Sequence, residues 1–241
     1  MEKNIKFFVG LDVHKETIVV AVAESGREGA RVIGTFAHDV PKLVKVLARL
    51  GPASQIHVVY EAGPTGYGLQ RALSGKGYVC EVIAPSLIPK RAGDRIKTDR
   101  RDALKLARLH RAGELSAVQV PAASDEAMRD LCRARTDAVQ DLRRGRAQRK
   151  AFLLRNGYRY TGKSAWSEAH RRYLRELVLP HPAQRVVLED AIAAIGAAGE
   201  RIARIEEQME ALLESWHMKP VVQALMGLRG FALTQGKGAA A

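Results

Sequence analysis

The feature that most restricts the fold is the order of apolar segments in the first 84 residues. Three strand-like segments come first, KFFVGLD, ETIVVAVAE and RVIGTFAH. The helical segment VPKLVKVLARL, the strand IHVVYE, the helix GYGLQRALSGKG and the strand YVCEVIA follow in that order. Strands that give way to a strand–helix alternation are typical of an α/β layer architecture. The sequence therefore predicts a mixed sheet with flanking helices.

The strand pattern ends near residue 98, and an all-α region is expected from there on. TDRRDALKLARLHRAGEL predicts a helix with Thr98 as its N-cap, because a threonine hydroxyl there accepts a hydrogen bond from a free backbone N–H. A long helix is predicted over residues 124–157. KSAWSEAHRRYLREL predicts a third helix, which Pro180 and Pro182 bring to an end.

The most regular helical pattern lies between residues 188 and 216. Its apolar residues are spaced alternately by three and four, and they are Leu188, Ala191, Ile195, Ala198, Ile202, Ile205, Met209, Leu212 and Trp216. This heptad spacing predicts a coiled-coil seam. A helix of the same chain or a second copy of the chain can fill such a seam, and the pattern leaves both alternatives open.

The charge of the chain indicates a polyanionic partner. Lys and Arg number 39 and Asp and Glu 26, which gives a formal net charge of +13. Nine basic residues face three acids between residues 90 and 111, and seven face none between residues 142 and 160. Such an imbalance favours contact with nucleic-acid phosphates over a merely solvated surface.

Other classes are disfavoured by the composition. Two cysteines, Cys80 and Cys132, make neither a disulfide framework nor a metal cluster. No apolar run approaches the roughly 18 residues of a membrane span, and the segment MEKNIKFFVG does not resemble a signal peptide. We therefore expect no membrane association and a cytoplasmic location.

Four acids stand at positions that suggest a metal site. Asp12 ends the first strand, and Glu61 ends the strand IHVVYE, directly before the glycine-rich turn AGPTGYG. Asp99 and Asp102 are three residues apart at a helix start and so share one face. Each acid alone has an ordinary explanation as a turn or dipole residue. Acids within a basic strip suggest instead Mg²⁺ ions that act on a phosphodiester.

Three segments, GLDVHK, YEAGPTGYGL and KTDRRDALKLA, together resemble the DEDD transposases of the insertion-sequence 110 type. The resemblance covers about residues 5–115, and the helical region after residue 124 resembles the coiled coil of that family. It implies an RNase H-like domain similar to RuvC, and a divalent-metal site for Mg²⁺, with Mn²⁺ as an alternative. The catalytic, metal-binding residues that it implies are Asp12, Glu61, Asp99 and Asp102.

The resemblance also implies an organisation and partners. The expected domains are residues 1–115 (RNase H-like), 116–218 (helical and coiled-coil) and 219–241 (the start of a C-terminal domain). We expect DNA transposition in a bacterial or archaeal cell, close to the nucleoid, with DNA and an element-encoded guide RNA as partners and a homo-oligomer formed through residues 188–216.

One departure from the family pattern concerns the C-terminal domain, which carries a nucleophilic serine. VVQALMGLRGF resembles the entrance to that domain, but no segment of this sequence matches the serine motif. We therefore expect an incomplete chain that keeps the metal site and the nucleic-acid surfaces.

The expected nucleic-acid contacts are basic residues of the acid-containing strip and of the long helix: Lys15, Lys97, Arg100, Arg101, Arg143, Arg144, Arg149 and Lys150. His14 is expected either to contact a phosphate or a metal-bound water or to be a surface turn residue. Trp166 and Trp216 are expected to pack between helices.

Three alternatives are weighed against transposition. A sugar-kinase or actin-like ATPase would need a glycine soon after the first acid, where Val13, His14 and Lys15 stand. A RuvC-like junction-resolving nuclease would use the same acids, but it has less need of the long basic helices. A non-catalytic fragment would bind nucleic acid or full-length transposase through its seam.

Overall fold

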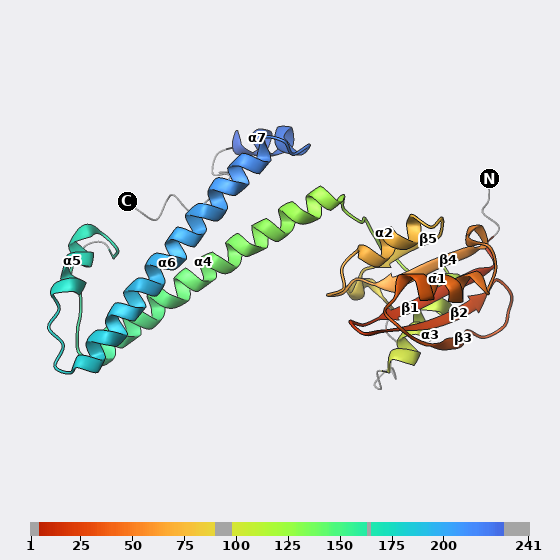
Figure 1. The fold of residues 1–241 in the computed structure, drawn as a ribbon, viewed down its shortest axis with the longest axis horizontal. Coiled ribbons are helices and arrows are strands. Elements are labelled where there is room, and N and C mark those ends of the chain that lie inside the picture. The colour runs from red at the N-terminus through yellow and green to blue at the C-terminus, as the bar shows by residue number, and fades with distance from the viewer. Residues whose placement is uncertain (1–4, 90–97, 163–164, 229–241) are drawn as a thin grey trace. The chain divides into compact units, whose positions relative to one another are not determined.

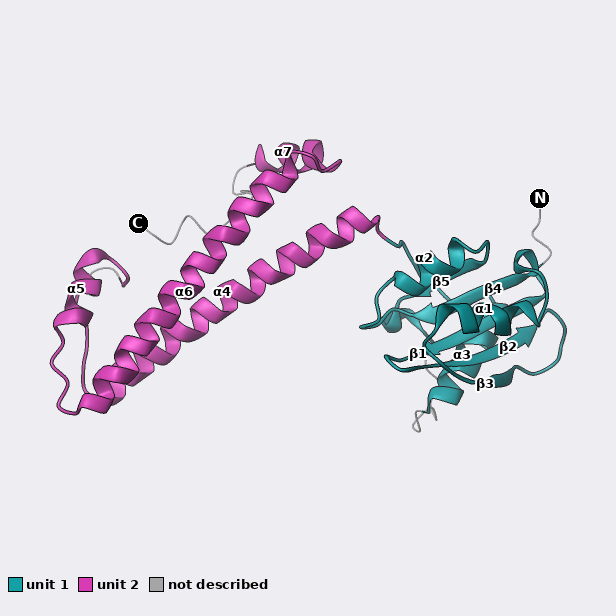
Figure 2. Ribbon diagram, viewed as in Figure 1, with its two compact units in different colours: residues 1–120 teal, residues 121–241 magenta. Residues whose placement is uncertain are grey.

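The computed structural model describes residues 5–89, 98–162 and 165–228. The chain divides into two compact units, residues 1–120 and residues 121–241 (Figure 2). The division after residue 120 falls close to the domain boundary expected after residue 115.

The N-terminal unit contains a six-stranded mixed sheet (Figure 1). Its strands are β1 (Phe7–Val13), β2 (Thr17–Glu24), β3 (Arg31–Ala37), β4 (Ile56–Glu61), β5 (Val79–Ile83) and β6 (Ala117–Val118). Their order is β3-β2-β1-β4-β5-β6, with β1, β4 and β5 mutually parallel and the other neighbours antiparallel. This confirms the predicted α/β, RNase H-like fold class.

Helices cover both faces of this sheet. They are α1 (Val40–Ala48), α2 (Gly68–Ser74) and α3 (Asp99–Arg111), with the short 3-10 helices η1 (Ala53–Gln55) and η2 (Pro85–Leu87). One buried cluster joins the sheet to α1 and α2 and includes Leu11, Val58, Leu43, Leu47 and Leu73. A second cluster joins it to α3 and includes Val19, Ala21, Ala103 and Ala107. Successive strand residues point to opposite faces, which is why apolar runs such as TIVVAVAE are buried throughout.

The sequence patterns located the three α-helices of this unit and five of its six strands. Thr98 caps α3 as predicted, because its Oγ1 accepts a hydrogen bond from the backbone N–H of Arg101 at 3.3 Å. The expectation that no strand follows residue 98 is wrong. The strand β6 pairs Val118 with Val82 and Ala117 with Ile83. Two residues are too few to produce a recognisable apolar alternation.

The C-terminal unit is helical. It contains α4 (Ala123–Arg155), α5 (Glu168–Glu176), α6 (Pro182–Leu213) and α7 (Lys219–Met226). Helices α4 and α6 pack side by side as an antiparallel hairpin, with α5 at its closed end (Figure 1). At the open end the indole Nε1 of Trp216 donates a hydrogen bond to Asp125 Oδ1 at 2.8 Å.

The predicted seam of α6 faces α4 of the same chain. Leu188, Ile195 and Met209 are buried there, whereas Leu212 is 47% exposed and Leu213 takes the buried position. At about 100° per residue, Leu213 lies about 20° around the helix from Leu188, and Leu212 lies about 120° away. At this end of α6 the buried side therefore follows the 3.6-residue period of a straight α-helix, which selects Leu213, and not the strict heptad, which selects Leu212. Within the described residues the seam has an intramolecular partner, and the homo-oligomer stays a prediction.

None of the helices within the described ranges has both the length and the apolar character needed to cross a bilayer.

Candidate metal centre

The two strand-end acids lie at the same edge of the sheet. Strands β1 and β4 are parallel neighbours, and their register pairs Leu11 with Tyr60. The next residue on each strand is Asp12 and Glu61, respectively. Carboxyl ends of parallel strands form one edge, where binding sites of open α/β sheets gather. The sheet topology thus brings together two acids that are far apart in sequence.

Helix α3 brings the other two acids to this edge because it packs closely on β1 at Gly10. A Cβ atom added to Gly10 would lie 2.4 Å from the carbonyl oxygen of Ala103 and 2.4 Å from the amide nitrogen of Ala107. Only a residue without a side chain permits this approach. Asp99 and Asp102 stand in the first turn of α3. Asp99 is one turn before Ala103, and Asp102 is the residue directly before Ala103.

His14 links Asp12 to Asp99. Its Nε2 lies 3.2 Å from Asp12 Oδ2 and 3.6 Å from Asp99 Oδ1. Asp12, His14 and Asp99 each offer one ligand atom, and these three atoms all lie within 4.8 Å of one another. His38 Nδ1 holds the turn with a 2.7 Å hydrogen bond to the carbonyl oxygen of His14. His14 is therefore close enough to take part in a metal site.

The electrostatics of Asp12 favour a bound cation. Burial raises the pKa of the Asp12 carboxyl, the neighbouring His14 lowers it, and the nearby Asp99 and Asp102 raise it further. Burial and like charges both destabilise the ionised carboxylate. A cation at this position would relieve both effects, and oxygen donors of this kind suit Mg²⁺ or Mn²⁺.

Glu61 and Asp102 share the wall of one cavity of about 350 Å³. Lys105 and Ser86 also line this cavity. The structure thus brings Asp12 close to Asp99 and Asp102, and Asp102 close to Glu61. Asp12, His14 and Asp99 form the group of ligand atoms, whereas Glu61 and Asp102 line a cavity and are not members of that group.

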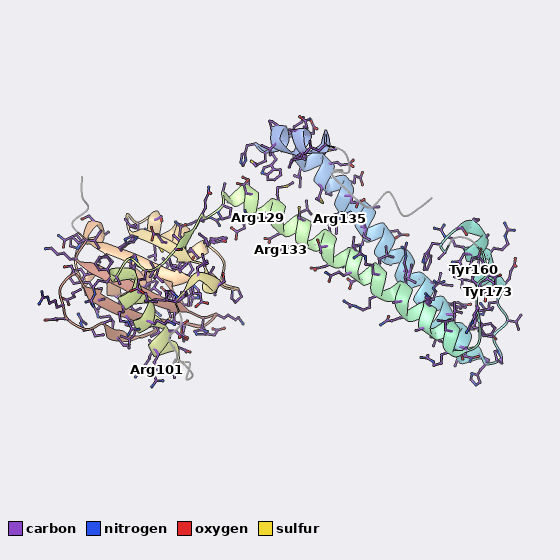
Figure 3. The ribbon with its side chains drawn as sticks, turned by 180° about the vertical axis from the view of Figure 1, so that it is seen from behind. Arg101, Arg129, Arg133, Arg135, Tyr160 and Tyr173 are labelled. Carbon is purple, nitrogen blue, oxygen red and sulfur yellow. The ribbon has the colours of Figure 1, made fainter. Side chains whose placement is uncertain are left out.

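The predicted nucleic-acid residues of this unit are exposed where the structure describes them. The Lys15 side chain is 93% exposed and directly follows His14. Arg100 and Arg101 are exposed in the first turn of α3, and Figure 3 shows Arg101 at this end of the helix. Lys97 lies outside the described residues.

On α4, the structure separates one predicted contact from the others. Arg143, Arg144 and Lys150 are exposed, whereas Arg149 is only 5% exposed. The guanidinium carbon of Arg149 lies 4.4 Å from the centroid of the Trp166 ring. Arg149 therefore does not share the exposed surface of the other three residues, and its contact with nucleic acid stays a prediction. A count of charges along a helix does not say which face another segment covers.

Sequence reasoning missed Gly10 as a positioning residue. The signal was present, because a glycine inside a buried strand pattern indicates a close backbone approach. The identity of the approaching helix, α3, comes only from the tertiary structure.

The sheet and its carboxylate cluster define a class: RNase H-like proteins with acids at the ends of central strands. A family model described as "Transposase", for DEDD transposases of the IS110 type, matches residues 9–156. The chain belongs to this IS110-type transposase family.

Two similar proteins agree with this assignment. The chain is 43% identical over 228 residues to "Putative transposase y4qE" of Sinorhizobium fredii (strain NBRC 101917 / NGR234), covering 94% of this chain and 55% of that protein. It is 33% identical over 228 residues to "Transposase for insertion sequence element IS1533" of Leptospira borgpetersenii, covering 93% of this chain and 66% of that protein. The chain thus spans between about half and two thirds of the length of these relatives.

Proposed function

We propose that this chain provides the divalent-metal site with which an insertion-element transposase cleaves and exchanges DNA strands. The observation that carries the proposal is the group that Asp12, His14 and Asp99 form at the sheet edge where Glu61 also ends its strand, with Asp102 lining the same cavity as Glu61. Membership of the transposase family favours this function over the junction-resolving nuclease and over a purely binding fragment.

In this proposal the metal ligands are Asp12, Glu61, Asp99 and Asp102. Bound Mg²⁺ or Mn²⁺ would supply Lewis-acid stabilisation of charge on the phosphodiester oxygens. Asp12 presents its carboxylate from the rigid end of a buried strand, and Asp99 and Asp102 present theirs from a capped helix start. Both supports are regular elements, which hold ligands more firmly than loops do.

The basic residues around the acids would hold the nucleic-acid backbone. Lys15, Arg100 and Arg101 surround the acids in sequence and are exposed. Lys105 lines the same cavity as Glu61 and Asp102. Cations placed beside metal-binding acids allow a phosphate to approach a site that would otherwise repel it.

The partners follow from the same reasoning. We propose DNA as the substrate and an element-encoded guide RNA as a second nucleic acid, in line with the net charge of +13. We also propose a homo-oligomer that uses outward surfaces of residues 188–216, and a location close to the nucleoid.

Calorimetric titration of Mn²⁺ into the full chain tests the metal site. We expect wild-type protein to bind and Asp12→Asn to weaken binding by at least about tenfold, since a charged ligand is lost. Glu24→Gln is the matched control, because it also removes one carboxylate charge but from the other end of the sheet, where Glu24 pairs with Phe7. Equal binding by all three folded proteins would contradict the proposal.

A further inference from the structure

A second cluster of basic side chains lies within residues 121–241 and contains none of the four acids. We call it the arginine pocket. It is a cavity of about 390 Å³, and the residues of its wall that matter here are Arg146 of α4, Arg171 and Arg175 of α5, Trp166, and Glu200 of α6. Arg149 lies beside it, against the same tryptophan ring.

Two guanidinium groups meet the ring of Trp166. Their central carbons lie 5.1 Å (Arg146) and 4.4 Å (Arg149) from the ring centroid. Within the described residues, neither arginine has a carboxylate partner, and the Nε atom of each is buried without a hydrogen bond. Burial and the charge of Arg146 lower the pKa of the Arg149 guanidinium. Buried cations ordinarily have an anionic partner, and in the part of the chain that the structure describes neither the buried Arg149 nor the half-buried Arg146 has one.

His170 does not supply the missing acceptor. Its Nδ1 accepts a hydrogen bond from the backbone N–H of Trp166 at 2.9 Å, and its Nε2 lies 3.0 Å from Arg149 Nη1. A neutral imidazole has only one acceptor nitrogen, so His170 cannot accept from both donors. Burial and Arg149 lower the pKa of His170, which keeps the ring neutral. The cluster is therefore short of hydrogen-bond acceptors.

The backbone of Trp166 is also held in an unusual conformation. Its φ angle is +73°, a region that residues with a side chain rarely adopt. Strain of this kind persists where surrounding contacts determine it, and such positions are frequent at ligand-binding sites. Tyr160 and Tyr173 pack nearby, with ring centroids 5.2 Å apart, and Figure 3 shows both beside α5. Trp166 thus has a defined backbone conformation at the pocket.

The charges around the pocket leave a positive surplus. Arg171 and Arg175 are mostly exposed, at 61% and 65% of their side chains. Glu168 lies 2.7 Å from Arg175 and 4.0 Å from Arg171, and Glu200 is the other acid at the pocket. Four arginines against two glutamates give a surplus of two positive charges.

We propose that the arginine pocket binds a backbone phosphate of a nucleic-acid strand, DNA or RNA. An exposed phosphodiester has the acceptor oxygens and negative charge that Arg146 and Arg149 lack, and Arg171 is placed to contact it from the rim. The exposed Arg143 and Lys150 lie about 60° and about 40° around the same helix from Arg146 and extend the basic surface on this side of α4. This site adds a nucleic-acid contact in the helical unit to the proposed cleavage site in the sheet unit.

The test uses the full chain with 5-fluorotryptophan at both tryptophans. ¹⁹F NMR then reports each ring separately, so that Trp216 is an internal control for Trp166, and Trp166→Phe assigns the signals. The probes are a 12-nucleotide single-stranded DNA, an RNA of the same sequence, and inorganic phosphate. We expect the oligonucleotides to shift the Trp166 resonance and to leave that of Trp216 in place.

Affinities come from the fluorescence anisotropy of the same oligonucleotides carrying a fluorescein. We expect Arg171→Gln to weaken binding about 5- to 10-fold and to reduce the salt slope by about one. Arg171 is exposed, so this variant folds even if Arg146→Gln does not. The matched control is Arg133→Gln, which removes the same charge from an exposed position of α4 away from the pocket (Figure 3) and should change affinity less than about twofold.

The outcomes decide the proposal. A Trp166 shift together with a larger affinity loss for Arg171→Gln than for Arg133→Gln supports the proposal. The oligonucleotide, RNA or DNA, for which the effect is larger identifies the strand that the pocket binds. Equal losses for Arg171→Gln and Arg133→Gln overturn it, as does oligonucleotide binding that leaves the Trp166 resonance unmoved. Saturation by inorganic phosphate, with no competition from the oligonucleotides, assigns the pocket to a small anion and also overturns it.

Discussion

Gly10 shows how one residue without a side chain can position charged groups elsewhere. Its contact with the α3 backbone determines how closely that helix lies on β1. Asp99 precedes Ala103 by about one helical turn, and Asp102 is the residue directly before Ala103. Any outward shift of α3 therefore moves two of the four proposed metal ligands away from Asp12.

We predict that Gly10→Ala weakens both the fold and the metal site. The added methyl group overlaps backbone atoms at 2.4 Å, and backbone yields less easily than a flexible side chain. Overpacking of this kind typically costs about 1–3 kcal/mol of unfolding free energy. Urea unfolding and Mn²⁺ titration measure the two effects. Gly29→Ala is the control, because nothing lies within 4 Å of its added Cβ; similar behaviour of both variants would show that α3 is not positioned here.

His110 makes the stability of the sheet unit dependent on pH. Its ring is 9% exposed and lies 4.3 Å from the His57 ring and 5.3 Å from the Phe8 ring, centroid to centroid. Burial, and to a lesser degree His57, lower its pKa from 6.5 to about 4. His57 in turn lies 3.5 Å from Glu81, so a carboxylate belongs to the same group of contacts.

We predict that acid destabilises this unit through His110. The unfolded chain binds the proton near pH 6.5 and the folded chain only near pH 4, so unfolding free energy is fully retained above pH 6.5 and is lost as the pH falls toward 4. The loss is on the order of 3 kcal/mol at most. Chemical denaturation at several pH values measures it, and His110→Phe should flatten the dependence in this window. An unchanged slope in that variant would assign the effect to other groups.

Sequence patterns predicted single residues well where their chemistry is local. Thr98 was found as a cap because capping depends on the next three residues. The positions of the four acids could be predicted because strand ends and helix starts can be read from the chain, and their role as metal ligands stays a prediction. The burial of Arg149 could not be predicted, because it depends on Trp166 and His170, which approach from a separate segment.

Among the elements, the α4–α6 hairpin satisfies an apolar seam that sequence alone leaves without a partner. Heptad spacing predicts that a seam exists, but it carries no information on which helix fills it. The structure fills it from α4 of the same chain, with Arg135 and Glu206 forming an ion pair of 2.7 Å across the two helices. Gly145 lets α4 approach Ile195, whose Cγ1 would lie 3.1 Å from an added Cβ.

We predict that Leu188→Ala destabilises the hairpin without making its stability depend on protein concentration. Leu188 is fully buried, and such truncations cost about 2–5 kcal/mol. Thermal unfolding monitored by circular dichroism at several concentrations tests this. Val187→Ala, at a 48% exposed neighbour, is the control and should have little effect. A melting temperature that rises with concentration in the wild type and no longer does so in Leu188→Ala would instead indicate that a second chain fills the seam.

At the scale of the whole molecule, each unit has a core of its own. The buried clusters around Leu11, Val19 and Val59 contain only residues of the first unit, and the cluster around Leu174 and Leu188 contains only residues of the second. A unit with its own core can fold alone. The net charge predicted a polyanion as partner but not where it binds, because charge is a property of the entire chain.

We predict that residues 1–120 expressed alone bind Mn²⁺ with an affinity within about twofold of the full chain. All four proposed ligands belong to this unit. A twofold difference in Mn²⁺ affinity is small beside the roughly tenfold loss expected when one ligand is removed. Calorimetry on the fragment measures the affinity, and Asp12→Asn in the fragment is its control. A folded fragment that no longer binds would mean that residues after 120 complete the site.

The hydrogen bond between Trp216 and Asp125 joins the end of α6 to the beginning of α4. The chain therefore runs out along α4, returns along α6, and ends this hairpin beside the residue where α4 begins. The two helices can change in length together while the start of α4 and the end of α6 stay in contact. Removing about seven residues, or two turns, from each of α4 and α6 at facing positions should bring α5 and the arginine pocket closer to that point by about 10 Å. The length of the hairpin thus sets the distance of α5 from the Trp216–Asp125 contact, and that length can change while the contact is kept.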